Sequence, residues 1–117
     1  MTGASGRAAE GARRGPARHE RPAIDEAALV AARAADRMVD AARERDVARW
    51  AAYLEPMPDA LRDADIPELR KIALKARAAY GPKDSIRDVL PAEVTEPFLD
   101  AIDRLLKVLA RRDAHEG

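Results

Sequence analysis

The chain has 117 residues, enough for one small domain, and its 21 basic residues balance its 21 acidic residues. This balance gives neither the positive field of a strong nucleic-acid binder nor a strongly acidic surface. Cysteine is absent, which excludes disulfides, zinc–thiolate sites and thiol catalysis.

The first segment, residues 1–22, is rich in glycine and arginine and nearly lacks large apolar side chains. It cannot bury enough surface to offset the entropy lost on ordering, so we expect a disordered basic arm. One interpretation is an arm that binds phosphates or an acidic partner, and the other is a dispensable extension. Its candidate nucleic-acid contacts are Arg7, Arg13, Arg14, Arg18 and Arg21.

Residues 23–112 are expected to form an all-α domain, and residues 113–117 a frayed tail. Pro22 suits the first turn of a helix, and no glycine or proline follows until Pro56. One uninterrupted helix of ~32 residues would be about 48 Å long, which exceeds the needs of so small a domain.

The two halves of this predicted helix differ in apolar content. In the second half Val47, Trp50 and Leu54 recur three and four positions apart, which predicts a face that packs on a core. The first half is mostly alanine, whose small side chains let another helix approach closely. We therefore consider a helix-mediated homodimer, and the alternative is packing within the chain. The candidate interface residues are Leu29, Val30, Met38, Val39, Trp50 and Tyr53, although for the two aromatics we favour the core.

Pro56 and Pro58 should end the long helix, with one loose turn after them. A second helix then has clear boundaries, because Asp65 and Glu68 have the spacing of a capping box and Gly81 suits a left-handed helix end. Its remaining face has four cations, which form a second set of candidate nucleic-acid contacts: Arg70, Lys71, Lys75 and Arg77.

Residues 78–97 then predict a two-stage corner. Asp84 or Ser85 caps a short helix that ends at Pro91, and Thr95 caps the last helix, with Pro97 in its first turn. That last helix has a broad apolar stripe and runs to about Arg112. The fold class is therefore all-α: a small helical bundle with one long N-terminal helix, two further helices and a short connecting helix.

Few residues suggest chemistry. Gly81, Lys83 and Ser85 do not have the spacing of a phosphate-binding loop, and a helix precedes them where such a loop follows a strand. A helix-turn-helix is disfavoured because its second helix would be short and acidic. Both histidines lie in the tails, so we expect no catalytic set, metal or cofactor. Lys83 and Glu93 are left without a structural role.

These patterns favour a non-enzymatic protein–protein interaction module that acts by self-association or by adaptor or regulatory binding. The alternative is a nucleic-acid-associated regulator that uses the arginine-rich arm. No apolar run approaches the ~20 residues of a membrane span, and the start lacks the features of a signal peptide, so we expect a cytoplasmic protein. We attribute the excess of arginine (17) over lysine (4) to a GC-rich bacterial genome.

Overall fold

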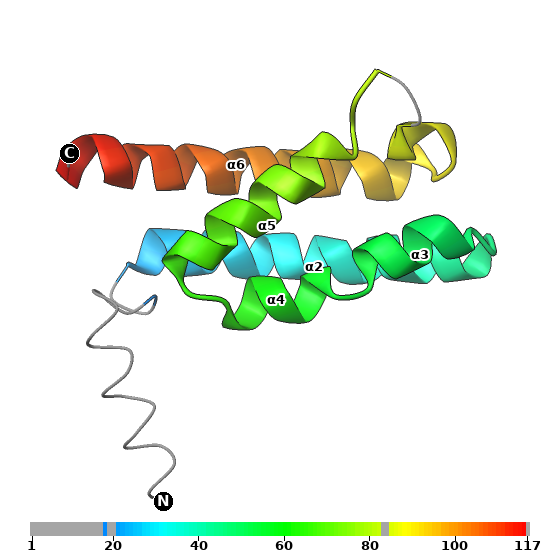
Figure 1. Ribbon diagram of the computed structural model, residues 1–117, viewed down its shortest axis with the longest axis horizontal. Coiled ribbons are helices and arrows are strands. Elements are labelled where there is room, and N and C mark those ends of the chain that lie inside the picture. The colour runs from blue at the N-terminus through cyan, green and yellow to red at the C-terminus, as the bar shows by residue number, and fades with distance from the viewer. Residues whose placement is uncertain (1–17, 19–20, 83–84, 117) are drawn as a thin grey trace, which may run out of the picture.

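The computed structural model of the protein describes Arg18, residues 21–82 and residues 85–116, with side chains up to residue 111 (Figure 1). The elements formed by these residues are all helical, which confirms the predicted fold class. They are α2 (Pro22–Glu44), α3 (Ala48–Leu54), α4 (Met57–Asp63), α5 (Ile66–Ala78), the short 3-10 helix η2 (Ile86–Asp88) and α6 (Ala92–Glu116).

The two long helices, α2 and α6, lie side by side and run in opposite directions (Figure 1). After α2 the chain reverses, and α3 and α4 pack back along α2. Helix α5 then crosses diagonally over the pair, in contact with α4 and α6. Helix α2 contacts α6, α4 and α3, and it is therefore the centre of the bundle.

Alanine dominates the buried side of α2. Of its eleven buried residues eight are alanine, and the other three are Ile24, Met38 and Val39. Small side chains let neighbouring helices approach closely, and larger side chains from those helices fill the remaining space. These larger side chains include Leu61 of α4 and Phe98, Ile102, Leu105 and Leu109 of α6.

The prediction of one helix through residues 23–55 is wrong, because α2 ends at Glu44. The amide of Asp46 donates to the Arg43 carbonyl (3.1 Å), and the amide of Val47 donates to the Ala42 carbonyl (3.0 Å). Asp46 has a φ of 55°. This hydrogen-bond pair around a left-handed residue is a Schellman motif, here with aspartate where glycine is usual. The apolar face of Trp50 and Leu54 therefore belongs to a separate helix, α3.

The corner after α3 is also more regular than predicted. In place of a loose turn, residues 57–63 form α4, and Pro58 lies in its first turn, where a missing amide hydrogen costs little. Met57, Pro58 and Leu61 are buried. The two prolines thus end α3 and start α4.

The start of α5 is confirmed, because the side chain of Asp65 accepts a hydrogen bond from the Glu68 amide (3.0 Å). Its end differs from the prediction. The helix stops at Ala78, and the amides of Ala79 and Tyr80 bond three residues back. Gly81 does not have the predicted left-handed conformation.

The last helix begins earlier than predicted. The carbonyl of Pro91 accepts hydrogen bonds from the amides of Val94 and Thr95 (both 3.1 Å), so α6 starts at Ala92, and Thr95 is not its cap. Pro97 lies inside the helix, past its first turn. At the other end α6 continues to Glu116, through most of the segment predicted to fray. Ser85 does cap η2, as predicted, by accepting from the Arg87 amide (3.2 Å).

The left-handed turn at Asp46 gives a direct test of the break between α2 and α3. We expect Asp46→Gly to raise the free energy of unfolding by roughly 0.5 kcal/mol and Asp46→Val to lower it by about 1–2 kcal/mol, because a side chain strains this conformation. Urea titration of the two variants measures both values. If Asp46→Val is as stable as the original protein, the left-handed turn is not present in solution.

Candidate functional site

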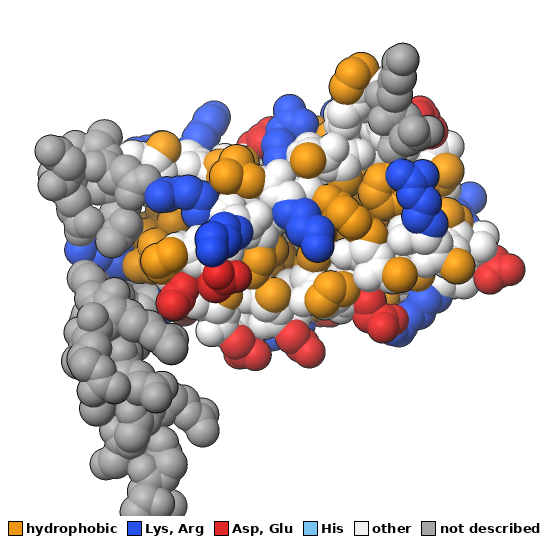
Figure 2. Space-filling view, viewed as in Figure 1, with side chains coloured by type: hydrophobic (Ala, Val, Ile, Leu, Met, Phe, Trp, Pro, Cys, Tyr) orange, Lys and Arg blue, Asp and Glu red, His pale blue; other side chains and the backbone are white. Residues whose placement is uncertain are grey.

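The exposed side of α5 joins one large apolar side chain to four cations. Leu74 is 54% exposed, the highest value among the large apolar side chains that the structure describes. Its neighbours on the helix surface are the four residues three and four positions away, and three of these are cationic: Arg70, Lys71 and Arg77. Figure 2 shows basic and hydrophobic side chains interspersed where α5 crosses the bundle. We call this surface the basic α5 face; it consists of Arg70, Lys71, Leu74, Lys75 and Arg77.

Contacts within the chain hold three of these cations in place. Lys71 pairs with Glu68 (Nζ to Oε1, 3.4 Å), and Arg77 pairs with Asp103 of α6 (Nε to Oδ1, 3.1 Å). Lys75 places its Nζ 5.2 Å from the centre of the Tyr53 ring. The cations on both sides of Leu74 are therefore positioned by the fold.

The charge of α5 contrasts with that of the rest of the domain. Helix α5 has four basic residues and one acidic residue, whereas the other residues from position 23 onward have 12 basic and 18 acidic residues. A protein with no net charge thus has a local positive field on one face. Such a field attracts anionic partners and raises their rate of association.

The predicted interface residues fall in different places. Leu29 and Val30 are exposed on α2. Met38, Val39 and Trp50 are buried within the single chain, so their side chains are not available to a second chain in this structure. Tyr53 lies at right angles to Trp50, with 5.4 Å between the ring centres, and its hydroxyl donates to the Lys75 carbonyl. Burial raises the pKa of Tyr53 and keeps this donor protonated. Tyr53 therefore joins α3 to α5.

The predicted basic arm lies mostly outside the described residues, and Arg7, Arg13 and Arg14 are among those not described. Arg18 is described and belongs to the folded domain. Its Nε donates to Asp25 Oδ1 (2.9 Å) in the first turns of α2, and its Nη1 donates to the Ala64 carbonyl (3.0 Å) at the end of α4. Only 10% of its side chain is exposed, so Arg18 is not a phosphate contact in this arrangement. The boundary predicted at residue 22 assigns this residue to the arm, whereas its contacts here are with α2 and the end of α4.

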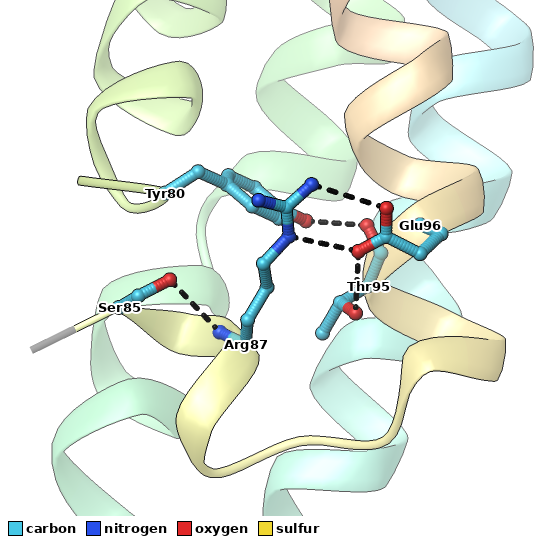
Figure 3. A network of polar contacts seen from close by, with 5 residues as sticks. All are labelled: Tyr80, Ser85, Arg87, Thr95 and Glu96. Carbon is cyan, nitrogen blue, oxygen red and sulfur yellow. Dashed lines mark hydrogen bonds and ion pairs between the residues drawn. The ribbon is translucent and has the colours of Figure 1, made fainter. Parts of the chain in front are cut away.

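The corner between α5 and α6 contains a network of polar contacts (Figure 3). The Tyr80 hydroxyl donates to the buried Thr95 carbonyl (2.7 Å). Arg87 of η2 binds both carboxylate oxygens of Glu96 (2.9 and 3.1 Å), and its guanidinium lies 5.5 Å from the centre of the Tyr80 ring. The Thr95 hydroxyl also approaches Glu96 (3.4 Å). The sequence patterns did not predict these contacts of Tyr80 and Arg87, because their partners come from another helix.

The electrostatics of this corner favour a structural role. Burial raises the pKa of Tyr80, and the nearby Glu96 charge raises it further. The hydrogen bond from Arg87 lowers the pKa of Glu96. Tyr80 therefore stays protonated and Glu96 stays ionised near neutral pH. A general acid or base needs a pKa near the working pH, and both shifts move the pKa away from it. The network holds the α5–α6 corner closed.

A separate hollow of about 450 Å³ lies where the end of α2 meets the start of α6. It includes Glu93, which the sequence patterns had left without a role, but neither Tyr80 nor Glu96. Two positive and three negative side chains line it together: Arg37, Asp40, Glu44, Arg45 and Glu93. This mixture selects neither an anion nor a cation. Lys83 lies outside the described residues.

Other kinds of site find no support in the described part of the chain. There, no group of three or more histidine or acidic side chains is placed to hold a metal ion. None of the described helices has the length and apolar character needed to cross a membrane. A helix-turn-helix lacks its second helix, because η2 has three residues. No protein-family model, curated protein or solved structure matches this chain.

The Arg87–Glu96 pair predicts how acid affects stability. Because the folded state lowers the Glu96 pKa below its ordinary value of 4.5, the pair stabilises the protein fully above that value. The contribution is lost as the pH falls through the lowered pKa. The difference in unfolding free energy between the original protein and Glu96→Gln should therefore shrink on acidification. Urea titrations of both proteins over a pH series measure this difference in unfolding free energy. A difference that does not change with pH would contradict the role of the ion pair.

Proposed function

We propose that the protein is a non-enzymatic interaction module that binds an acidic protein partner through the basic α5 face. The observation that carries this proposal is the exposure of Leu74, at 54%, among cations that the fold holds in place. An exposed leucine alone is ordinary, but a helix that surrounds one with positively charged side chains has the features of a recognition surface.

The two kinds of side chain have different tasks in this proposal. Burial of Leu74 by a partner supplies affinity, since full burial of a leucine side chain contributes about 1.5–3 kcal/mol and roughly half of this one is exposed. The cations supply specificity and a faster encounter with an acidic surface. The apolar stems of Lys71 and Lys75 also extend the area that a partner can cover.

A partner with an amphipathic acidic helix fits this surface best. Such a helix presents apolar residues at intervals of three and four with carboxylates beside them, so one apolar residue meets Leu74 while its carboxylates meet Arg70 and Lys71. The hydroxyl of Tyr53 anchors α5 to α3. A surface that is already positioned loses less entropy on binding.

Titration of the ¹⁵N-labelled protein with acidic amphipathic 20-residue peptides tests the proposal. We expect amide shifts concentrated in residues 68–78, and a loss of roughly tenfold or more in affinity for Leu74→Asp, which puts a carboxylate against the apolar residue of the peptide. Arg104→Glu is the control for charge, because it reverses an exposed cation on α6. The same peptides with lysine in place of their acidic residues should not bind. Equal binding of both peptide sets would overturn the proposal.

Nucleic acid is the second candidate, and the net charge of +3 on α5 is the observation that favours it. The ion pairs of Lys71 and Arg77 weaken a contact with phosphates and with a partner's carboxylates alike, but Leu74 has a role only with a protein partner. The arginines of the first 17 residues would then have to supply most of the affinity. Because binding releases counterions, the affinity for duplex DNA should fall steeply with salt and should be lost when residues 1–17 are removed. Fluorescence anisotropy measures both effects, and equal binding by the truncated protein would exclude the arm.

A further inference from the structure

A second exposed surface lies on α2, on the side away from its buried alanines. We call it the α2 stripe; it consists of Glu26, Leu29, Val30 and Arg33, which are all exposed and lie three or four positions apart. Leu29 is 36% exposed and Val30 is 39% exposed. They are two of the four large apolar side chains that the described residues leave exposed, and they are adjacent.

The charges of the stripe are arranged symmetrically about this apolar pair. Glu26 comes before the pair and Arg33 after it, each at the same number of residues from the midpoint between Leu29 and Val30. A two-fold axis through that midpoint therefore exchanges the position of the acid with that of the base. Such self-complementarity is what an isologous interface between two identical chains requires.

The two charged side chains have no competing task in the described part of the chain. Neither Glu26 nor Arg33 has a hydrogen bond or ion pair with another described residue. This contrasts with Asp25 and Asp36 on the same helix, which bind Arg18 and Arg62. The charges of the stripe are thus available to a partner, whereas Asp25 and Asp36 are already used by the fold.

We infer that a second copy of this chain docks on the α2 stripe, with the two α2 helices antiparallel. In this arrangement Leu29 of each copy packs on Val30 of the other, and Glu26 of each copy pairs with Arg33 of the other. A parallel arrangement in register would place Glu26 against Glu26 and Arg33 against Arg33, and both contacts would repel. The order of the charges therefore selects the antiparallel direction.

The proposed interface is small, which sets the expected strength of the dimer. From Glu26 to Arg33 the stripe extends about 10 Å along the helix axis, at 1.5 Å per residue. Contacts of this extent belong with weak and transient interfaces, below about 1,200 Å² of total buried surface. We therefore expect a monomer–dimer equilibrium that depends on concentration and weakens with added salt. This interface is independent of the basic α5 face, which lies on another helix.

Charge exchange between two variants tests the inference. In the variant Glu26→Arg both stripe charges are positive, and in the variant Arg33→Glu both are negative. We expect each variant alone to dimerise roughly tenfold or more weakly than the original full-length chain, because two symmetric attractions become repulsions. An equimolar mixture of the two should associate as a heterodimer, and the double variant E26R/R33E should recover the homodimer. Sedimentation velocity over a concentration series measures association in the two single variants, their mixture and the double variant.

The outcomes separate this inference from the proposed function. Leu74→Asp should dimerise like the original protein, whereas Val30→Asp should not dimerise. All substituted positions are exposed on helices, so unchanged circular dichroism and thermal midpoints verify that the variants fold. An original protein that stays monomeric at high concentration would overturn the inference. So would single-charge variants that dimerise as well as the original, or a mixture that fails to associate.

Discussion

The close approach of neighbouring helices to the alanine side of α2 is the constraint on which the rest of the structure depends. Alanine contributes little apolar area, so α2 stabilises the bundle mainly by letting α6, α4 and α3 come near enough for their larger side chains to fill the space. Phe98, Leu105 and Leu61 are fully buried for this reason. A helix that is buried through its small residues has an opposite side free for other uses, and on α2 that side holds Leu29 and Val30.

Beside the apolar contacts, three side-chain hydrogen bonds join different segments of the chain. Arg18 joins the start of α2 to the end of α4, the Tyr53 hydroxyl joins α3 to α5, and the Tyr80 hydroxyl joins the end of α5 to α6. Each of these side chains donates to a backbone carbonyl of another segment. These bonds therefore help to fix how the helices are placed, and the apolar contacts fix how closely they pack. Two of them, those of Tyr53 and Tyr80, anchor α5, which carries the basic α5 face.

Local signals made by the usual residues could be predicted from the sequence, whereas a local signal made by an unusual residue, and signals that depend on the rest of the fold, could not. The start of α5 follows from Asp65 and Glu68, which act within one turn, so it was predicted correctly. The break after Glu44 was missed because its left-handed residue is an aspartate, which a search for glycine and proline passes over. Pro97 resembled a first-turn proline, but the amides of Val94 and Thr95 donate to the Pro91 carbonyl, so α6 starts at Ala92, five residues before Pro97.

The candidate surfaces were also predicted only in part from the sequence. The cations of α5 were recognised as one set because their spacing is helical, but Leu74 was not, since an apolar residue in a helix is usually part of a core. The signal that could have found it is the three cations among its nearest helix neighbours. Met38 and Val39 share the alanine-rich helix with Leu29 and Val30, and only the position of the other helices separates the buried pair from the exposed pair. Composition alone could not make that distinction.

The contact of Arg18 with the Ala64 carbonyl also has a consequence for the order of folding. It joins residues that are 46 positions apart, so a long loop must close before the contact can form. The contacts that start α5 and close the α5–α6 corner are much more local, and local contacts form early in small helical proteins. We therefore expect the C-terminal helices to assemble first, with the attachment of Arg18 as one of the last steps and one of the first to open on unfolding.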